Sequence, residues 1–264
     1  MTMLFNICLG VCFGSLLVSA IALCSSRRMF ERLAMALLVV GVLAQTAYMI
    51  LRWIHAGRAP FSNMFESLVL FSWSIGIVYL AFSIRTRLKV LAAAVSLFMV
   101  LALAFASTFG SDIKPLMPAL QSNWLTFHVS SCFLGYAGFA ISFIAAIGYL
   151  VAICPGRKVK PETIDALELI TDKTISFGFL FLTIGIITGS VWANSAWGSY
   201  WSWDPKETWS LITWFVYAVF LHCRFIRGWH GKKTACISIA GFLSVLFTYF
   251  GVNFLIASMH SYAQ

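Results

Sequence analysis

The sequence predicts an all-α integral membrane protein, a polytopic bundle of about eight transmembrane helices. Composition is the first observation, because 61% of the 264 residues are hydrophobic and only 10% are charged, which is far from the balance of a soluble domain. The second observation is a series of apolar runs, each long enough to cross a bilayer as an α-helix. The third is the placement of basic residues, which gather in alternate connections between those runs.

The expected helices follow one another along the whole chain, with boundaries good to a few residues. We place them at residues 3–24, 33–54, 65–84, 88–108, 126–153, 174–195, 208–226 and 234–257. In the most charged connection, the stretch from Pro161 to Asp172 can form a short surface helix. Gly135, Gly138 and Gly148 can allow the helix at 126–153 to pack closely on a neighbour.

Lysine and arginine predict which side of the membrane each connection faces. Fourteen of the 18 basic residues lie in four connections, at residues 25–32, 85–89, 154–173 and 223–233. By the positive-inside rule this side is cytoplasmic, or stromal in a plastid, so both termini are expected outside. The same bias accounts for the net charge of +9 and requires no nucleic-acid partner. We expect a single transmembrane domain over residues 1–264, with an external tryptophan-rich loop at residues 192–209.

Aromatic residues are concentrated in the stretch from 197 to 209, between two apolar runs. It contains Trp197, Tyr200, Trp201, Trp203 and Trp209. Tryptophan and tyrosine favour the membrane interface, so an aromatic belt would explain one or two of them. Four tryptophans in thirteen residues, in the order WGxxWxWD, instead favour a flat aromatic platform for a large planar apolar ligand.

The same stretch ends in a helix start. Asp204 suits the N-cap, Pro205 suits the first helical position, and Glu207 would complete a capping box. Capping alone explains the type and spacing of Asp204 and Glu207. The alternative is that Asp204 also takes part in binding the planar ligand.

Three of the five histidines occupy informative positions. His128 lies at the outer end of the helix at 126–153, and His260 follows the last predicted helix on the same side. His222 lies near the inner end of the helix at 208–226, roughly 20 Å from the tryptophan-rich loop at ~1.5 Å per residue. A lone membrane histidine can simply hydrogen-bond between helices, but it is also a candidate functional residue. Paired imidazoles are the usual way to hold a haem iron, so His128 and His260, at matched outer depth, are candidate metal ligands.

Three segments carry a resemblance to a known family. They are WGSYWSWDPKETWSLITW at 197–214, GRAPFSNMFES at 57–67 and LIASMHSYA at 255–263. Together with His128 and His222, these segments resemble the CcsA/ResC family. Its members are haem-handling proteins of system II cytochrome c biogenesis with a tryptophan-rich WWD domain. The resemblance covers nearly the whole chain from about Trp53 onward.

The resemblance implies haem b (iron protoporphyrin IX) as a bound substrate. It implies that His128 and His260 ligate the iron at an external site, and that His222 belongs to an inner site. The second axial histidine of the inner site would come from a separate membrane subunit of the ResB/Ccs1 type. The implied cofactor-binding residues are His128, His222, His260, Trp197, Trp201, Trp203, Asp204 and Trp209.

The implied activity is to move haem outward and present it, reduced, to apocytochrome c, where its vinyl groups form thioethers with a CxxCH motif. The chain would then be the haem-handling subunit of a cytochrome c synthetase, or haem lyase, complex. It would reside in the bacterial cytoplasmic membrane, or in the thylakoid membrane if the host is a plastid.

Two other classes of protein share parts of this pattern. A haem exporter of the system I CcmC type would have the tryptophan-rich loop and two outer histidines, but six spans and no need of His222. A transporter for another solute would place polar residues along several spans, where they are scarce here. Arg58, Lys114 and Lys206 are the outward basic residues that can meet haem propionates, and the sequence does not decide among them.

Overall fold

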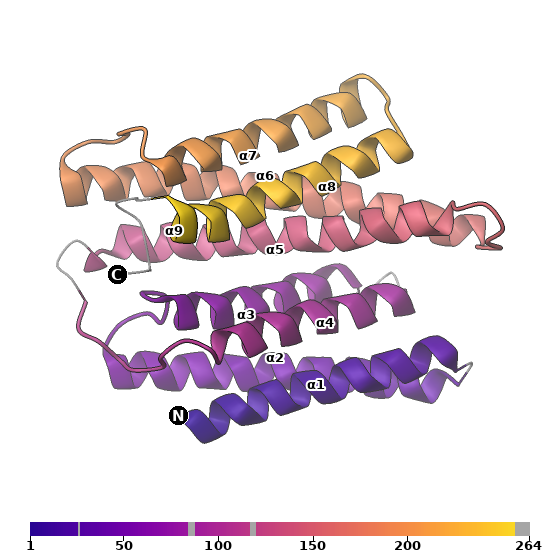
Figure 1. Cartoon of the computed structure of the whole chain (residues 1–264), viewed down its shortest axis with the longest axis horizontal. Helices are drawn as coiled ribbons and strands as arrows, with labels where there is room; N and C mark the ends of the chain where they lie inside the picture. Colours follow the sequence, from indigo (N-terminus) through magenta and orange to yellow (C-terminus); the bar gives the residue numbers. More distant parts are fainter. Residues whose placement is uncertain (26, 84–87, 117–119, 257–264) are drawn as a thin grey trace. The chain divides into compact units, whose positions relative to one another are not determined.

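The computed structural model of the protein describes residues 1–25, 27–83, 88–116 and 120–256. The helices are α1 (Thr2–Cys24), α2 (Arg28–Ala56), α3 (Met64–Ser83), α4 (Lys89–Ala106), α5 (Asn123–Ala152), α6 (Pro161–Trp197), α7 (Pro205–Leu221), α8 (Lys232–Leu246) and α9 (Val252–Leu255). Two π-helical turns interrupt this series (Figure 1). The turn η2 (His222–Ile226) continues α7, and the turn η3 (Phe247–Gly251) joins α8 to α9.

Eight helical segments within the described ranges are long and apolar enough to cross a membrane. The prediction of an all-α protein with about eight spans is therefore confirmed. The largest difference from the predicted boundaries is in α6, which begins at Pro161 rather than near 174. The separate surface helix predicted from Pro161 to Asp172 is wrong, because no glycine or proline interrupts residues 162–177 and the helix continues. Gly198, in the left-handed conformation, ends α6.

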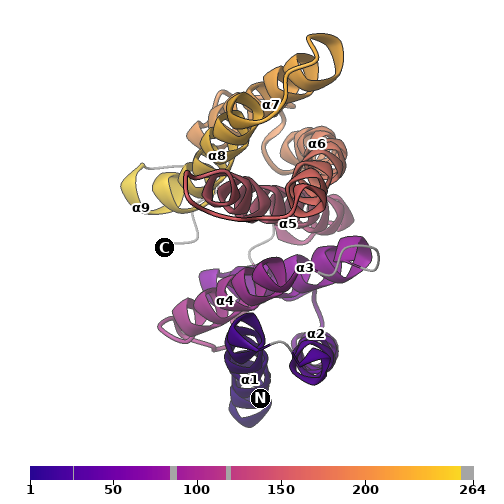
Figure 2. The ribbon, with the colours of Figure 1, turned by 90° about the vertical axis from the view of Figure 1, so that its right-hand side faces the viewer.

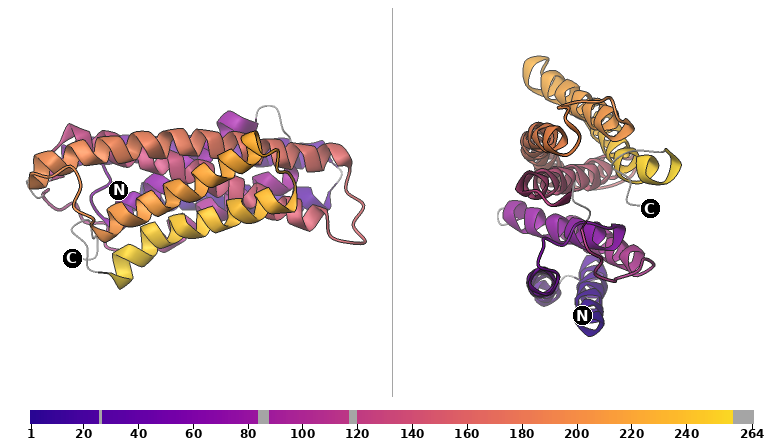
Figure 3. Two further views of the ribbon diagram at one scale, coloured as in Figure 1. Left: turned by 90° about the horizontal axis from the view of Figure 1, so that it is seen from above. Right: turned by 90° about the vertical axis from the view of Figure 1, so that its left-hand side faces the viewer.

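The chain divides into two compact units, Met1–Lys114 and Pro115–Gln264. In the first unit, α1 packs on α2 and on α4, and α3 packs on α4 and on α2 (Figure 2). In the second, α5 packs against α6 and α8, while α7 lies beside α8 and also contacts α6 (Figure 3). That these units act as one domain, as expected from the sequence, stays a prediction.

A buried carboxylate organises the connection between α2 and α3. The Glu66 side chain is fully buried and accepts hydrogen bonds from Arg52 Nε at 2.8 Å and from Arg58 Nη1 at 2.9 Å. The backbone N–H of Ser62 donates to the same carboxylate at 2.9 Å. Breaking such a buried pair leaves an uncompensated charge, at a cost of about 3–5 kcal/mol. The charged residues of the GRAPFSNMFES segment therefore hold this part of the fold.

Glycines bring α5 and α6 into backbone contact in the second unit. A Cβ at Gly138 would lie 2.7 Å from the carbonyl oxygen of Thr174, and one at Gly135 would lie 3.0 Å from another α6 carbonyl. The close packing predicted for these two glycines is confirmed. Gly148 makes a looser approach, since its Cβ would lie 3.3 Å from the side chain of Leu167. Gly135 and Gly138 thus bring the two helices into direct contact near the middle of each helix.

Candidate functional site

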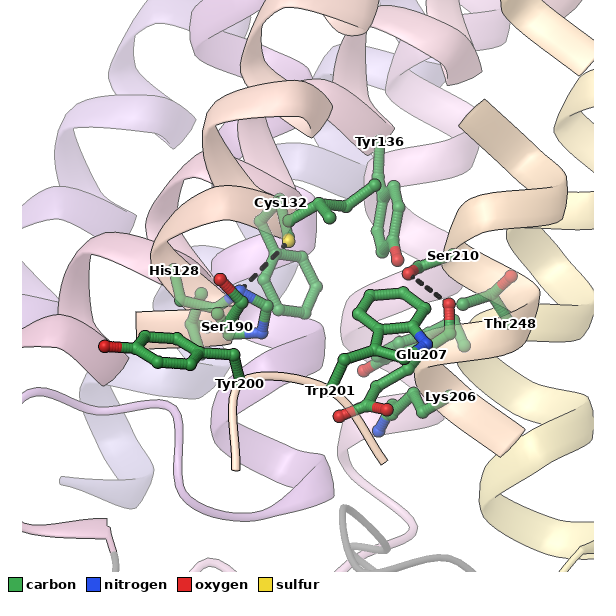
Figure 4. A pocket seen from close by; sticks show the side chains of 15 residues that line it. His128, Cys132, Tyr136, Ser190, Tyr200, Trp201, Lys206, Glu207, Ser210 and Thr248 are labelled. Carbon is green, nitrogen blue, oxygen red and sulfur yellow. Dashed lines mark hydrogen bonds between the residues drawn. The ribbon is translucent and has the colours of Figure 1, made fainter. Parts of the chain in front are cut away.

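A partly enclosed cavity lies where the tryptophan-rich loop joins α6 to α7 (Figure 4). Together with its open mouth it contains about 760 Å³ of space that no protein atom fills, part of which is open to solvent. Side chains from α5, α6, the loop, the start of α7 and η3 form its wall. The aromatic residues among them are Phe133, Tyr136, Tyr200, Trp201 and Tyr249. This lining suits a ligand with a large apolar surface.

His128 projects from the first turns of α5 into the wall of this cavity. Its Nδ1 lies 2.7 Å from the carbonyl oxygen of Gly185 in α6. A carbonyl can only accept, so Nδ1 carries the hydrogen and Nε2 is the ring atom suited to a metal. The ring also stacks on the buried Trp192, with 6.1 Å between ring centroids and 16° between planes. These two contacts thus hold the imidazole in one tautomer and one orientation.

Gly189 leaves the space that His128 occupies. A Cβ on Gly189 would lie 2.5 Å from Nδ1 of His128, closer than real Cβ atoms come to other atoms. One turn earlier, a Cβ on Gly185 would meet the Cys132 sulfur at 2.5 Å. Both glycines are therefore needed for the approach of α5 and α6 at the histidine.

The four tryptophans of the loop take different positions. Trp201 lines the cavity, while Trp203 is 69% exposed and its ring stands at 89° to that of Trp201. Trp197 packs edge-on against Trp192, and Trp209 packs on Phe247 with 4.1 Å between centroids. The rings of Trp201 and Trp203 therefore do not share the flat surface that the sequence suggested.

Trp203 also has a φ of +60°, which is uncommon for a residue other than glycine. Its carbonyl oxygen accepts a hydrogen bond from Thr208 Oγ1 at 3.3 Å. Strained backbone of this kind persists where the surroundings fix it. Here the following helix start supplies those contacts.

The predicted capping box at the start of α7 is confirmed. Asp204 Oδ1 accepts from the backbone N–H of Lys206 at 2.9 Å, and Glu207 Oε2 accepts from the N–H of Asp204 at 3.1 Å. Glu207 Oε2 also accepts from the N–H of Ser202 at 2.8 Å. Both carboxylates therefore fix the loop onto the helix.

Lys206 and Asn253 form a polar contact at the cavity that the sequence analysis did not foresee. Lys206 lines the cavity, and its Nζ donates to Asn253 Oδ1 at 2.9 Å. Asn253 is 3% exposed and donates through Nδ2 to the carbonyl oxygen of Tyr249 at 2.6 Å. A polar amide inside the last apolar run was the visible signal. The π-helical turn that turns Tyr249 toward the cavity left no comparable signal.

The remaining predicted site residues lie elsewhere. His222 is exposed and begins η2, at the far end of α7 from the cavity. Among the cavity residues that the structure describes, Trp197, Trp203, Asp204 and Trp209 do not appear. His260 lies outside the described residues. The structure thus brings His128 and Trp201 together and keeps His222 apart from them.

Comparison with known proteins now gives the family. Residues 61–260 match the family model described as cytochrome C assembly protein. The cytochrome c biogenesis protein CcsA of Chlamydomonas reinhardtii is 41% identical over 246 residues, covering 88% of this chain and 69% of that protein. CcsA of Synechococcus sp. (strain CC9605) is 38% identical over 258 residues, covering 86% and 85%. The chain belongs to the CcsA family. It is a multi-pass membrane protein of cytochrome c biogenesis.

A solved structure shares the fold of this CcsA-family chain. It is titled cytochrome c heme lyase CcmF, with a TM-score of 0.72 and 19% sequence identity. The match covers 98% of this chain but 46% of that one, so the chain spans just under half of that structure. At this identity the likeness concerns the fold alone.

Proposed function

We propose that the chain binds haem in the cavity beside His128 and presents it for covalent attachment to apocytochrome c. The observation that carries this proposal is the anchored imidazole, with Nδ1 fixed on Gly185 and the ring lining an aromatic cavity. Haem is a large planar apolar substrate with two propionates. The cavity offers it aromatic walls, an imidazole nitrogen and the cationic Lys206. The donor set and the lining therefore fit haem b as substrate.

His260 is the second axial ligand of this proposal. The helical part of the described chain ends at Leu255, five residues before His260. The adjoining η3 contributes Thr248 and Tyr249 to the cavity wall. The proposal takes its second ligand from the sequence that follows this part of the cavity wall.

His222 would belong to an inner site completed by a ResB/Ccs1-type subunit. The exposed side of α7 and η2 carries a row of mostly apolar residues at helical spacing. The row comprises Ile212, Phe215, Val219, His222 and Ile226, all exposed. An imidazole on a lipid-facing surface is costly without a partner. A second histidine supplied by another membrane helix would satisfy it.

The proposed role is positioning rather than acid–base catalysis. The chain would carry haem to the outer face and hold it against the cysteines of a CxxCH motif. The tryptophan-rich loop and both termini would face outward from a bacterial cytoplasmic membrane, or into the thylakoid lumen in a plastid. The eight spans of the described chain weigh against the six-span exporter of the CcmC type.

Replacing the outer ligands tests the proposal. His128→Ala and, separately, His260→Ala should convert a low-spin, six-coordinate haem spectrum into that of a five-coordinate iron and abolish cytochrome c maturation. Added imidazole should partly restore both, because it fills the vacant axial position. The visible spectrum of the purified protein and the yield of matured cytochrome c are the measurements.

His55→Ala is the matched control, since His55 is an exposed histidine at the end of α2. It should keep the parental spectrum and yield. If His128→Ala retains the low-spin spectrum and full maturation, His128 is not a ligand and the proposal fails.

A further inference from the structure

We propose that Lys206 binds a carboxylate of the substrate, so that the cavity prefers a tetrapyrrole with free propionates over its neutral ester. This inference rests on the proposed binding of haem in the same cavity. It adds how the planar ligand is oriented there. Three observations carry it: the fixed position of the ammonium group, the charge that it brings to the cavity wall, and the fact that the described lining of the cavity contains neither of the other two basic candidates.

Lys206 is held at both ends. Its backbone N–H is bound by Asp204 Oδ1 at 2.9 Å, and its Nζ donates to Asn253 Oδ1 at 2.9 Å. Asn253 is in turn fixed by its own bond to the carbonyl oxygen of Tyr249. A lysine normally loses rotamer freedom when it binds a ligand, and these contacts restrict it beforehand.

Lys206 brings positive charge to a wall that contains several aromatic rings and the Glu207 carboxylate. Of the described residues that line the cavity, it alone is a lysine or arginine. The neighbouring Glu207 carboxylate accepts through Oε2 from the backbone N–H groups of Ser202 and Asp204. A charge beside apolar rings acts in a lower dielectric than water, which strengthens its attraction for an anion.

The position of Lys206 suits the edge of a planar ligand. Figure 4 shows His128 beside Tyr200 and Ser190, and Lys206 beside Trp201 and Glu207 across the cavity. In haem the iron lies at the centre of the ring and the propionates lie on its edge. An imidazole at the metal and an ammonium at the edge can therefore contact one ligand together.

The other two basic candidates, Arg58 and Lys114, belong to the first unit of the chain. Arg58 donates to the buried carboxylate of Glu66 and to the carbonyl oxygen of Lys114, so its guanidinium holds the α2–α3 connection. Lys114 is an exposed residue of a loop. The described lining of the cavity contains Lys206 but neither Arg58 nor Lys114, so the structure assigns the carboxylate contact to Lys206.

Titration of the full chain in detergent with haemin and with haemin dimethyl ester tests this. The parent should bind haemin roughly tenfold to a hundredfold more tightly than the ester, which is the scale of a hydrogen bond to a charged group. Lys206→Gln removes the charge and keeps a polar end group for Asn253, so it should bind both probes within about twofold of each other. Lys206→Arg should restore most of the preference.

Lys114→Gln is the matched control and should keep the parental preference. If Lys206→Gln also keeps it, the assignment of Lys206 is overturned, and loss of both probes in His128→Ala would leave the proposed haem site standing. If His128→Ala binds both probes as the parent does, the proposed site fails and the inference fails with it.

Discussion

His128 and His222 belong to the same unit of the chain, yet their surroundings differ in kind. The His128 ring is fixed by Gly185 and Trp192 and faces a cavity whose described lining comes from this chain. The His222 ring is exposed on the mostly apolar row of α7 and η2. Contacts within the chain hold the first imidazole in one orientation, while the second is exposed.

Exposure of His222 does not mean that its segment is loosely held. Two residues later, Arg224 Nε donates to Asp172 Oδ2 at 2.8 Å, and its Nη2 lies 3.8 Å from Glu168 Oε2. Arg224 also donates to the carbonyl oxygen of Trp229 at 3.0 Å. The backbone of η2 is thus tied to α6 while the imidazole points away. The two histidines therefore differ in their surroundings: residues of this chain contact the His128 ring, whereas the His222 ring is exposed.

The largest expected effect concerns the proposed inner site at His222, which differs from the outer site at His128 in needing a second subunit. His222→Ala should remove the inner-site haem when a ResB/Ccs1-type subunit is co-expressed, because one axial imidazole is lost. The same substitution should leave the haem content of the chain alone unchanged. Visible spectra of the two preparations measure this. Val219→Ala, on the same row, is the control and should retain the inner haem; equal inner-site loading of His222→Ala and parent complexes would contradict the comparison.

A second prediction concerns the preorganisation of His128. Gly189→Ala should lower haem occupancy of the outer site by tenfold or more, because the new Cβ would lie 2.5 Å from Nδ1 and push the ring off the carbonyl of Gly185. The helices should still insert. Haem titration of purified protein is the measurement, with Gly10→Ala as control, since a Cβ there has no heavy atom within 4 Å. Parental affinity in Gly189→Ala would show that the ring does not need this position.

The fold was predictable because its determinants are local. Apolar runs and basic connections gave the spans, and the order of Asp204, Pro205 and Glu207 gave the start of α7. The uninterrupted α6 was missed because the charge of residues 161–173 outweighed the absence of helix breakers. Helix boundaries are hardest to predict from sequence where two signals, here charge and the absence of helix breakers, conflict.

The candidate site was predictable only in its chemical components. His128 and Trp201 could be named from residue type and spacing, since a metal ligand and a stacking ring have recognisable identities. The roles of Gly189, Lys206 and Asn253 depend on contacts between segments far apart in the chain. No local pattern reports that a glycine on α6 makes room for a histidine on α5. The contrast between Trp201 and Trp203 likewise follows from tertiary packing.

The smallest expected effect sharpens this last contrast within the outer site. Trp201→Ala should weaken haem binding by about 2–3 kcal/mol, because a ring that lines the cavity loses roughly 100 Å² of contact at ~25 cal/mol per Å². Trp203→Ala should change the affinity by less than about threefold if its ring remains outside the cavity, as its 69% exposure indicates. Haem titration of both variants, alongside a check of membrane insertion, measures the difference. Equal losses in the two variants would mean that the ligand gathers both rings into one platform, and unchanged affinity in both would favour an interfacial aromatic belt.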